Sequence, residues 1–171
     1  MIKEFTVNVI RFIGLVLLQI FVLNNIQISG FIVPYAYLLF ILLLPLNAKP
    51  VLILLLSFLM GFTMDLFSYT PGLHAAACLV IGFVRPYLLD LLVSRDSVSG
   101  SASGSVYRLA SSWFIRYVVI MVLIHHIILF FLESFQFAHL LYTLCRIFGS
   151  ALFSSVIILL LGHLLMSRKS V

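Results

Sequence analysis

The chain has 171 residues, of which 64% are hydrophobic and only 9% are charged. A soluble domain carries roughly a quarter charged residues, so this chain has too little polar surface to cover itself in water. Composition therefore excludes a soluble globular protein and predicts an integral membrane protein without a separate soluble domain. The net charge of +5 gives no indication of nucleic-acid binding. Cys78 and Cys145 lie in apolar runs without metal-ligand spacing, so we interpret them as packing residues.

Six apolar runs approach or reach the roughly 20 residues that a helix needs to cross a bilayer. They cover residues 6–24, 31–46, 51–68, 73–92, 113–132 and 140–165. The first lacks a cleavage site of small residues, which favours an uncleaved helix over a signal peptide. The second is short and carries Pro34 and Pro45 near its ends, where a missing backbone donor is tolerated. The sequence predicts an all-α protein with six transmembrane helices.

The basic residues alternate along the predicted connections. They precede or begin the first run, separate the second from the third and the fourth from the fifth, and follow the sixth: Lys3, Arg11, Lys49, Arg95, Arg108, Arg168 and Lys169. The other three connections contain neither Lys nor Arg. The positive-inside rule then places both termini in the cytoplasm. Residues 93–112, rich in Ser and Gly, are predicted as a flexible cytoplasmic loop, for which a solvated state is favoured over contact with anionic lipid.

Ionisable groups inside spans are costly, so each requires a partner or a route to the interface. Asp65, near the outer end of the third run, and Arg146, in the sixth, reach a similar depth and are predicted to pair. Asp90 and Arg116 are predicted to pair in the inner leaflet. Arg85 is expected to extend its side chain toward the cytoplasmic interface.

Two alternatives bear on function at the polar positions inside the spans. Asp65 suits a proton or cation carrier or a structural residue; a relay needs several carboxylates along a path, so we favour pairing or helix capping. His125 and His126 point about 100° apart on a helix and cannot both bind one ion from one face, so we favour hydrogen bonds to neighbouring helices over a metal site. The chain offers no catalytic constellation and no cofactor motif.

Small residues recur at helical spacing in two of the predicted spans. The fourth run carries Ala75, Cys78 and Gly82, and the sixth carries Ser150 with Ser154 and Ala151 with Ser155. Small faces let membrane helices approach closely, and Gly61 in the third run can supply an opposing surface. Pro71 and Gly72 are strong turn residues and predict a tight outer hairpin.

The stretch GFTMDLFSYTPGLHAAA, residues 61–77, continues to GFVRPYLL and resembles the signature hairpin of the rod shape-determining MreD family, in its Bacteroidetes-type version. The likeness covers roughly residues 20–165. Its residues here are Gly61, Asp65, Pro71, Gly72, His74, Arg85 and Pro86.

The resemblance implies a non-enzymatic scaffold of the machinery that builds the lateral cell wall, in the bacterial cytoplasmic membrane. Its implied partners are an MreC-like protein, a RodA-like glycosyltransferase, a class B penicillin-binding transpeptidase and, indirectly, MreB. The implied fold is similar to the substrate-capture subunits of energy-coupling-factor transporters, so a subunit capturing a vitamin-like molecule is the main alternative. A proton-coupled carrier built on Asp65, Glu133 and the histidines is a third.

Overall fold

The computed structural model describes residues 2–26, 32–92, 112–134 and 140–167. Its elements are α1 (Ile2–Phe21), the 3₁₀ helix η1 (Leu23–Asn25), α2 (Leu38–Leu42), α3 (Pro50–Ser68), α4 (Leu73–Leu92), α6 (Ser112–Ser134) and α7 (Leu140–Ser167). Five stretches in these ranges are long and apolar enough to cross a membrane: Thr6–Asn25, Pro50–Ser68, Leu73–Leu92, Trp113–Ser134 and Leu140–Leu165. The described chain is helical and has the make-up of a multi-pass membrane protein, as composition predicts.

The second predicted transmembrane helix, residues 31–46, is wrong as a continuous helix. Its described part, residues 32–46, is irregular up to Tyr37 and helical only over α2, which has 5 residues. Pro34 and Pro45 explain the interruption, because proline lacks an N–H and disfavours helical geometry at the residue before it. We call residues 32–46 the inner segment.

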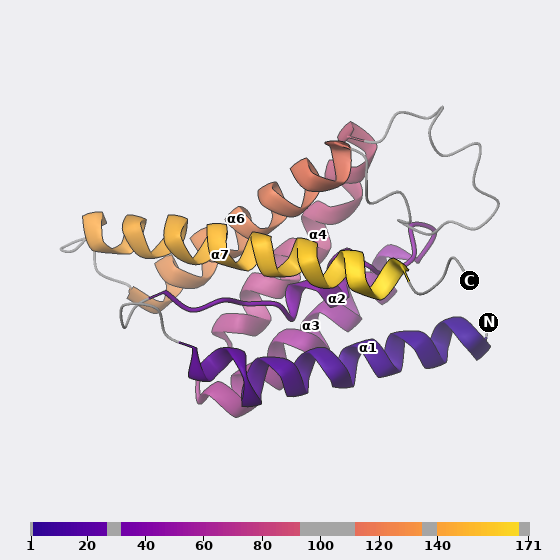
Figure 1. Ribbon diagram of the computed structural model, residues 1–171, viewed down its shortest axis with the longest axis horizontal. Helices are drawn as coiled ribbons and strands as arrows, with labels where there is room; N and C mark the ends of the chain where they lie inside the picture. The colour runs from indigo at the N-terminus through magenta and orange to yellow at the C-terminus, as the bar shows by residue number, and fades with distance from the viewer. Residues whose placement is uncertain (1, 27–31, 93–111, 135–139, 168–171) are drawn as a thin grey trace.

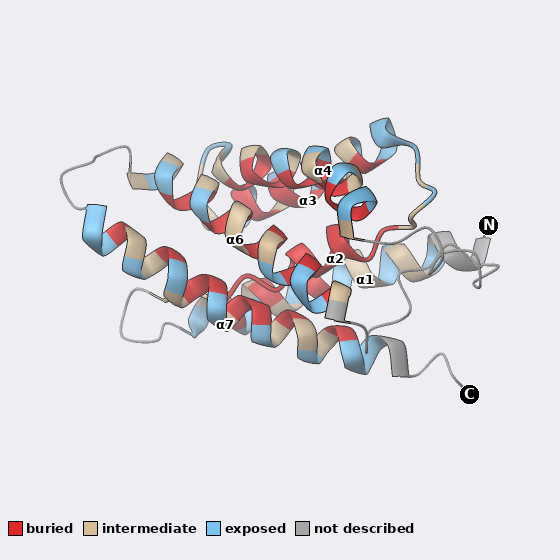
Figure 2. Ribbon diagram, turned by 90° about the horizontal axis from the view of Figure 1, so that it is seen from above, coloured by how far each residue is buried: buried red, intermediate tan, exposed pale blue. Residues whose placement is uncertain are grey.

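The inner segment forms the centre of the bundle. Residues Leu38–Leu42 are all buried, and α2 contacts α1, α3, α4 and α7. Around it, α3 packs along α4, α4 along α6, and α6 along α7. Figure 2 shows the buried positions on the helix faces turned inward. The hydrophobic core is therefore built around a segment that is helical only over α2.

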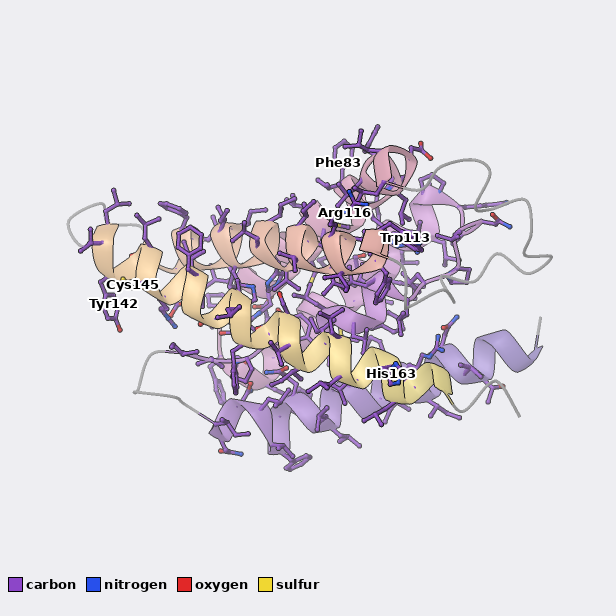
Figure 3. All side chains as sticks on the ribbon, turned by 45° about the horizontal axis from the view of Figure 1, so that its top comes forward. Phe83, Trp113, Arg116, Tyr142, Cys145 and His163 are labelled. Carbon is purple, nitrogen blue, oxygen red and sulfur yellow. The ribbon has the colours of Figure 1, made fainter. Side chains whose placement is uncertain are left out.

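The helices run between two ends of the bundle. The beginning of α1 and the end of α7 lie at one end, and the α3–α4 hairpin lies at the other (Figure 1). The inner segment leads the chain back toward the end at which α1 begins (Figure 1). Figure 3 places Tyr142 and Cys145 at one end and Trp113 and Arg116 toward the other.

Large apolar side chains cover the outside of the helices. Phe21, Leu66 and Leu152 are 70%, 61% and 70% exposed, and similar residues recur along α1, α3, α4, α6 and α7. A water-soluble monomer rarely exposes apolar surface on this scale, whereas lipid tails solvate it well. The outer surface fits the hydrocarbon region of a membrane.

Candidate functional site

The hairpin between α3 and α4 is organised by the Asp65 carboxylate. Asp65 Oδ1 accepts hydrogen bonds from the His74 backbone N–H at 2.9 Å and the Thr70 hydroxyl at 2.8 Å, and Oδ2 accepts one from the Ala75 N–H at 2.9 Å. The first N–H groups of a helix have no partner within it, and a carboxylate also complements the positive end of the helix dipole. Asp65 therefore caps α4 from the preceding helix, which confirms the structural interpretation.

Two backbone features close this hairpin. Tyr69 ends α3 in the left-handed conformation with φ 56°, and Gly72 has φ 83°. A Cβ placed on Gly61 would lie 2.6 Å from Ala75 Cα, so the two helices approach to a distance that only glycine allows. The predicted turn and the predicted small-residue contact are both confirmed.

Arg146 does not pair with Asp65, so that predicted pair is wrong. Its guanidinium lies 3.0 Å from Glu133 Oε1 and 4.3 Å from the centre of the Phe130 ring. The physical reason is that the Asp65 oxygens already accept three hydrogen bonds in the hairpin. The Arg146 and Glu133 side chains are 23% and 38% exposed, so the pair joins α6 to α7 without being a deeply buried charge pair.

The backbone of the inner segment is held by side chains from α1 and α7. Gln19 Oε1 accepts from the Ala36 N–H and Gln19 Nε2 donates to the Pro34 carbonyl, each at 2.9 Å. Ser154 Oγ accepts from the Tyr35 N–H at 2.9 Å. Non-helical backbone at membrane depth survives only where protein groups satisfy it, and these side chains supply that function.

Ser150 adds a fourth support, accepting from the Val33 N–H at 3.2 Å. Ser150 and Ser154 were predicted as a small face for helix packing. They do lie buried on α7, but they also act as hydrogen-bond acceptors for a neighbouring backbone. The serine hydroxyl, not only its small size, explains their use here.

Tyr37 joins the inner segment to two further helices. Its hydroxyl lies 2.8 Å from His74 Nδ1 on α4 and 2.8 Å from His125 Nε2 on α6. A hydroxyl has one proton, so it donates to one imidazole and accepts from the other. All three side chains are nearly inaccessible, and Tyr37 therefore clasps α4 and α6 around the inner segment.

His126 completes the network with a defined tautomer. Its Nδ1 lies 2.7 Å from the Val122 carbonyl, which can only accept, so Nδ1 carries the proton. Its Nε2, 3.1 Å from Ser154 Oγ, then accepts the serine proton, while Ser154 accepts from Tyr35 N–H. The predicted hydrogen bond to a neighbouring helix is confirmed for His126, whereas His125 bonds to Tyr37 in the irregular part of the inner segment. Among the described residues, no group of three His, Cys, Asp or Glu side chains could hold a metal ion.

The expectation that the Arg85 side chain extends toward the cytoplasmic interface is wrong. The side chain is 1% exposed and Nη2 donates to the Leu44 carbonyl. Leu44 follows the end of α2, where carbonyls lack helical donors, so Arg85 caps the short helix. Pro86, the next family-motif residue, lies inside α4.

The pair predicted between Asp90 and Arg116 stays a prediction, with both side chains exposed on neighbouring helices.

Sequence reasoning missed Gln19 and Tyr37, which carry much of the network. A polar residue in the middle of an apolar run was the available signal for Gln19, and for Tyr37 it was a polar hydroxyl one short stretch after Pro34, in Pro34-Tyr35-Ala36-Tyr37. Chemically, the arrangement satisfies the polar groups of a broken membrane segment and locks five helices together. No family model, no curated protein and no solved structure matches the chain.

Proposed function

We propose that the protein is a non-enzymatic membrane scaffold of the MreD type, which binds an MreC-like partner and supports lateral peptidoglycan synthesis. The observation that carries the proposal is the internal use of the motif residues. Gly61 packs on α4, Asp65 caps it and His74 bonds to Tyr37. Because these residues make their contacts within the protein, they fix the hairpin. The apolar outer faces of the helices then remain as the surface that a partner can bind.

The proposed topology has six crossings with both termini in the cytoplasm. Five crossings are the long helices, and the sixth is the inner segment. The alternation of basic and uncharged connections supports this orientation. The membrane would be the bacterial cytoplasmic membrane, where an MreC-like protein, a RodA-like glycosyltransferase and a penicillin-binding transpeptidase each present transmembrane helices.

Partner binding on this surface would rely on shape. Between lipid-exposed helices there is no hydrophobic driving force, so association depends on close packing of complementary faces. The rigid α3–α4 hairpin offers such a face, with Phe58 and Phe62 stacked at 5.7 Å between ring centres. Phe58, Phe62 and Leu66 are all exposed on one side of α3.

The main rival, capture of a vitamin-like molecule, needs convergent polar groups that are free to bind it. The polar side chains near the hairpin end are committed to the protein itself: Gln19, Asn24, Asp65, Thr70 and His74 all have protein partners. This commitment favours the scaffold over the capture subunit. It equally disfavours a carrier that uses Asp65 as its ion-binding carboxylate.

The test combines a partner assay with a depletion phenotype. The tagged protein is purified in mild detergent from its own host, after photo-crosslinking from positions Phe62 on α3 and Leu152 on α7, and bound proteins are identified. A scaffold should crosslink an MreC-like or penicillin-binding protein from one of the two faces. Its depletion should give rounded cells with misplaced wall synthesis. Absence of any partner, together with a nutrient requirement on depletion and tight binding of a small molecule, would overturn the proposal.

A further inference from the structure

Tyr37 and the two imidazoles that it joins form a buried cluster, which we call the Tyr37 clasp. The Tyr37 hydroxyl contacts His74 Nδ1 on α4 and His125 Nε2 on α6, each at 2.8 Å. The exposures of Tyr37, His74 and His125 are 0%, 4% and 0%. His125 Nδ1 is itself buried and has no hydrogen-bond partner in the described part of the chain. A hydrogen placed on this nitrogen therefore has no acceptor.

The unpartnered nitrogen assigns the direction of both hydrogen bonds in the neutral clasp. A buried N–H without an acceptor is rarer in proteins than an acceptor without a donor. His125 therefore carries its hydrogen on Nε2 and donates to Tyr37, and the Tyr37 hydroxyl donates to His74 Nδ1. In this arrangement both contacts of Tyr37 are satisfied, and neither imidazole carries a charge.

An added proton does not fit this arrangement. If Tyr37 still accepts from one imidazole and donates to the other, the proton leaves a hydrogen on His125 Nδ1, where it has no acceptor. If both imidazoles donate to Tyr37, its hydroxyl must turn to the Cys78 sulfur, which interacts with it but accepts only weakly. Either way the clasp holds a buried cation, which is costly without a counter-charge.

The groups of α3 and α6 that face the clasp do little to stabilise such a cation. From α3, the Asp65 carboxylate faces the first turn of α4 and favours a charge on His74, but its oxygens already accept three hydrogen bonds. From α6, His126 lies beside His125 with 5.4 Å between the ring centres, so a charge on one ring opposes a charge on the other.

The remaining elements present groups that are neutral in mild acid. These are Tyr35 from the inner segment, Cys78 from α4, Gln19 from α1 and Ser154 from α7. Near Tyr35 lie Arg146 and Glu133, which are 3.0 Å apart and are paired with each other. The closed clasp is therefore most stable when both of its imidazoles are neutral.

We propose that the Tyr37 clasp is an acid-sensitive switch, which holds the inner segment to α4 and α6 while both imidazoles are neutral and releases it when they are protonated. The released imidazoles become accessible to water, which solvates their charge. The element that moves is the inner segment, whose irregular backbone is held by side-chain hydrogen bonds. The switch is independent of the proposed scaffold role, because it involves no partner.

Cys78 reports on release, since it is 0% exposed and its thiol interacts with the Tyr37 hydroxyl. The full chain with Cys145→Ser is kept in mild detergent, and Cys78 is modified with a dipyridyl disulfide, a reagent that reacts with thiols in mild acid. The modification rate is measured at about pH 7.5 and about pH 5.5, on either side of the usual imidazole pKa of about 6.5. Circular dichroism at both pH values checks that the helices stay folded.

We expect the modification rate to rise about tenfold at the lower pH for each imidazole that is protonated on release. The sign follows because the open clasp binds more protons than the closed one, so its population grows as the pH falls. A rate that is no higher at the lower pH would overturn the proposal. A rise accompanied by loss of helix would overturn it too, because the whole chain and not the clasp would then be opening.

Matched variants assign the response to the clasp. His74→Asn and His125→Gln each place an amide near the nitrogen that contacts Tyr37, and an amide does not titrate. Each single variant should reduce the rise by about tenfold, and the double variant should remove most of it. His163→Gln, at an exposed position of α7 (Figure 3), should keep the full rise. An undiminished rise in both single variants would overturn the proposal, whether or not the double variant folds.

Discussion

Tyr37 shows how single side chains make a broken segment tolerable at membrane depth. Its hydroxyl satisfies His74 and His125 at once, each at 2.8 Å. A typical hydrogen bond contributes only about 0.5–1.5 kcal/mol net, whereas a buried polar atom left alone costs about 1–3 kcal/mol. The network therefore affects stability mainly because the loss of one partner leaves a buried polar atom unsatisfied.

Tyr37→Phe should lower the free energy of unfolding by about 1–3 kcal/mol, because it leaves an atom of each imidazole unsatisfied. For a chain of this size the Tm should fall by about 2–4 °C for each kcal/mol. Thermal unfolding in detergent measures this change. Tyr87→Phe is the matched control, since Tyr87 is 63% exposed and its loss should matter by less than about 0.5 kcal/mol. Equal Tm values for the two variants would show that the clasp contributes nothing.

Asp65→Asn should destabilise the hairpin by about 1–2 kcal/mol, the usual cost of a lost helix cap. The carboxylate uses both oxygens toward the N–H groups of His74 and Ala75, and an amide keeps only one acceptor oxygen. Hydrogen exchange at the first turn of α4 should increase. Asp90→Asn is the control, because Asp90 is exposed on α4 and its predicted pair with Arg116 would be a surface pair, whose loss costs less than about 1 kcal/mol. If Asp65→Asn kept full stability and partner binding but abolished an ion flux, the result would contradict the capping role and favour a role of Asp65 in transport.

Among the elements, the α3–α4 hairpin depends on the close approach of the two helix backbones at Gly61, where there is no room for a side chain. A Cβ on Gly61 would meet the backbone of His74 and Ala75, which cannot move aside as a flexible side chain can. A Cβ on Gly14 of α1 would meet nothing within 4 Å. The two glycines therefore offer a matched comparison of the same substitution in tight and open surroundings.

Gly61→Ala should cost about 1–3 kcal/mol by forcing α3 and α4 apart. Gly14→Ala should be neutral or stabilising by up to about 1 kcal/mol, because alanine favours a helix. Both changes are measured as Tm shifts in detergent and as crosslinking efficiency between α3 and α4. A stable Gly61→Ala variant with unchanged crosslinking would contradict the close packing.

The long helices and the hairpin were predictable because their signals are local. Apolar length marks α3 and α4, and Pro71, Gly72 and Asp65 mark the turn and its cap. The conformation of the inner segment was not predictable from its length, since a count of apolar residues cannot distinguish a helix from a buried segment of irregular backbone. The partner of Arg146 depended on which acceptors Asp65 had already filled, a fact of the tertiary arrangement. The hydrogen-bonding roles of Tyr37 and Gln19 could be inferred only after the inner segment was known to be irregular and to require hydrogen-bond partners.

At the scale of the whole molecule, the five long helices of the described ranges surround the inner segment, which is helical only over α2. Polar side chains from α1, α4, α6 and α7 bond to this segment, while the outward faces stay apolar. The design places the polar interactions inside and leaves the exterior to lipid and partner helices. It also means that the inner segment, although helical only over α2, decides how many times the chain crosses the membrane.

Cysteine labelling in intact cells tests that crossing directly. In a Cys145→Ser background, with Cys78 buried, single cysteines are introduced on the two sides of the inner segment, as Asn25→Cys at the end of η1 and Asn47→Cys after the inner segment; both positions are exposed. If the inner segment crosses, a membrane-impermeant maleimide should label the Asn25→Cys variant in intact cells. It should label the Asn47→Cys variant only after permeabilisation, and both should label equally then. Labelling of both variants in intact cells would mean that the inner segment turns back within the membrane, which reduces the crossings to the long helices and moves Lys49 to the outer side.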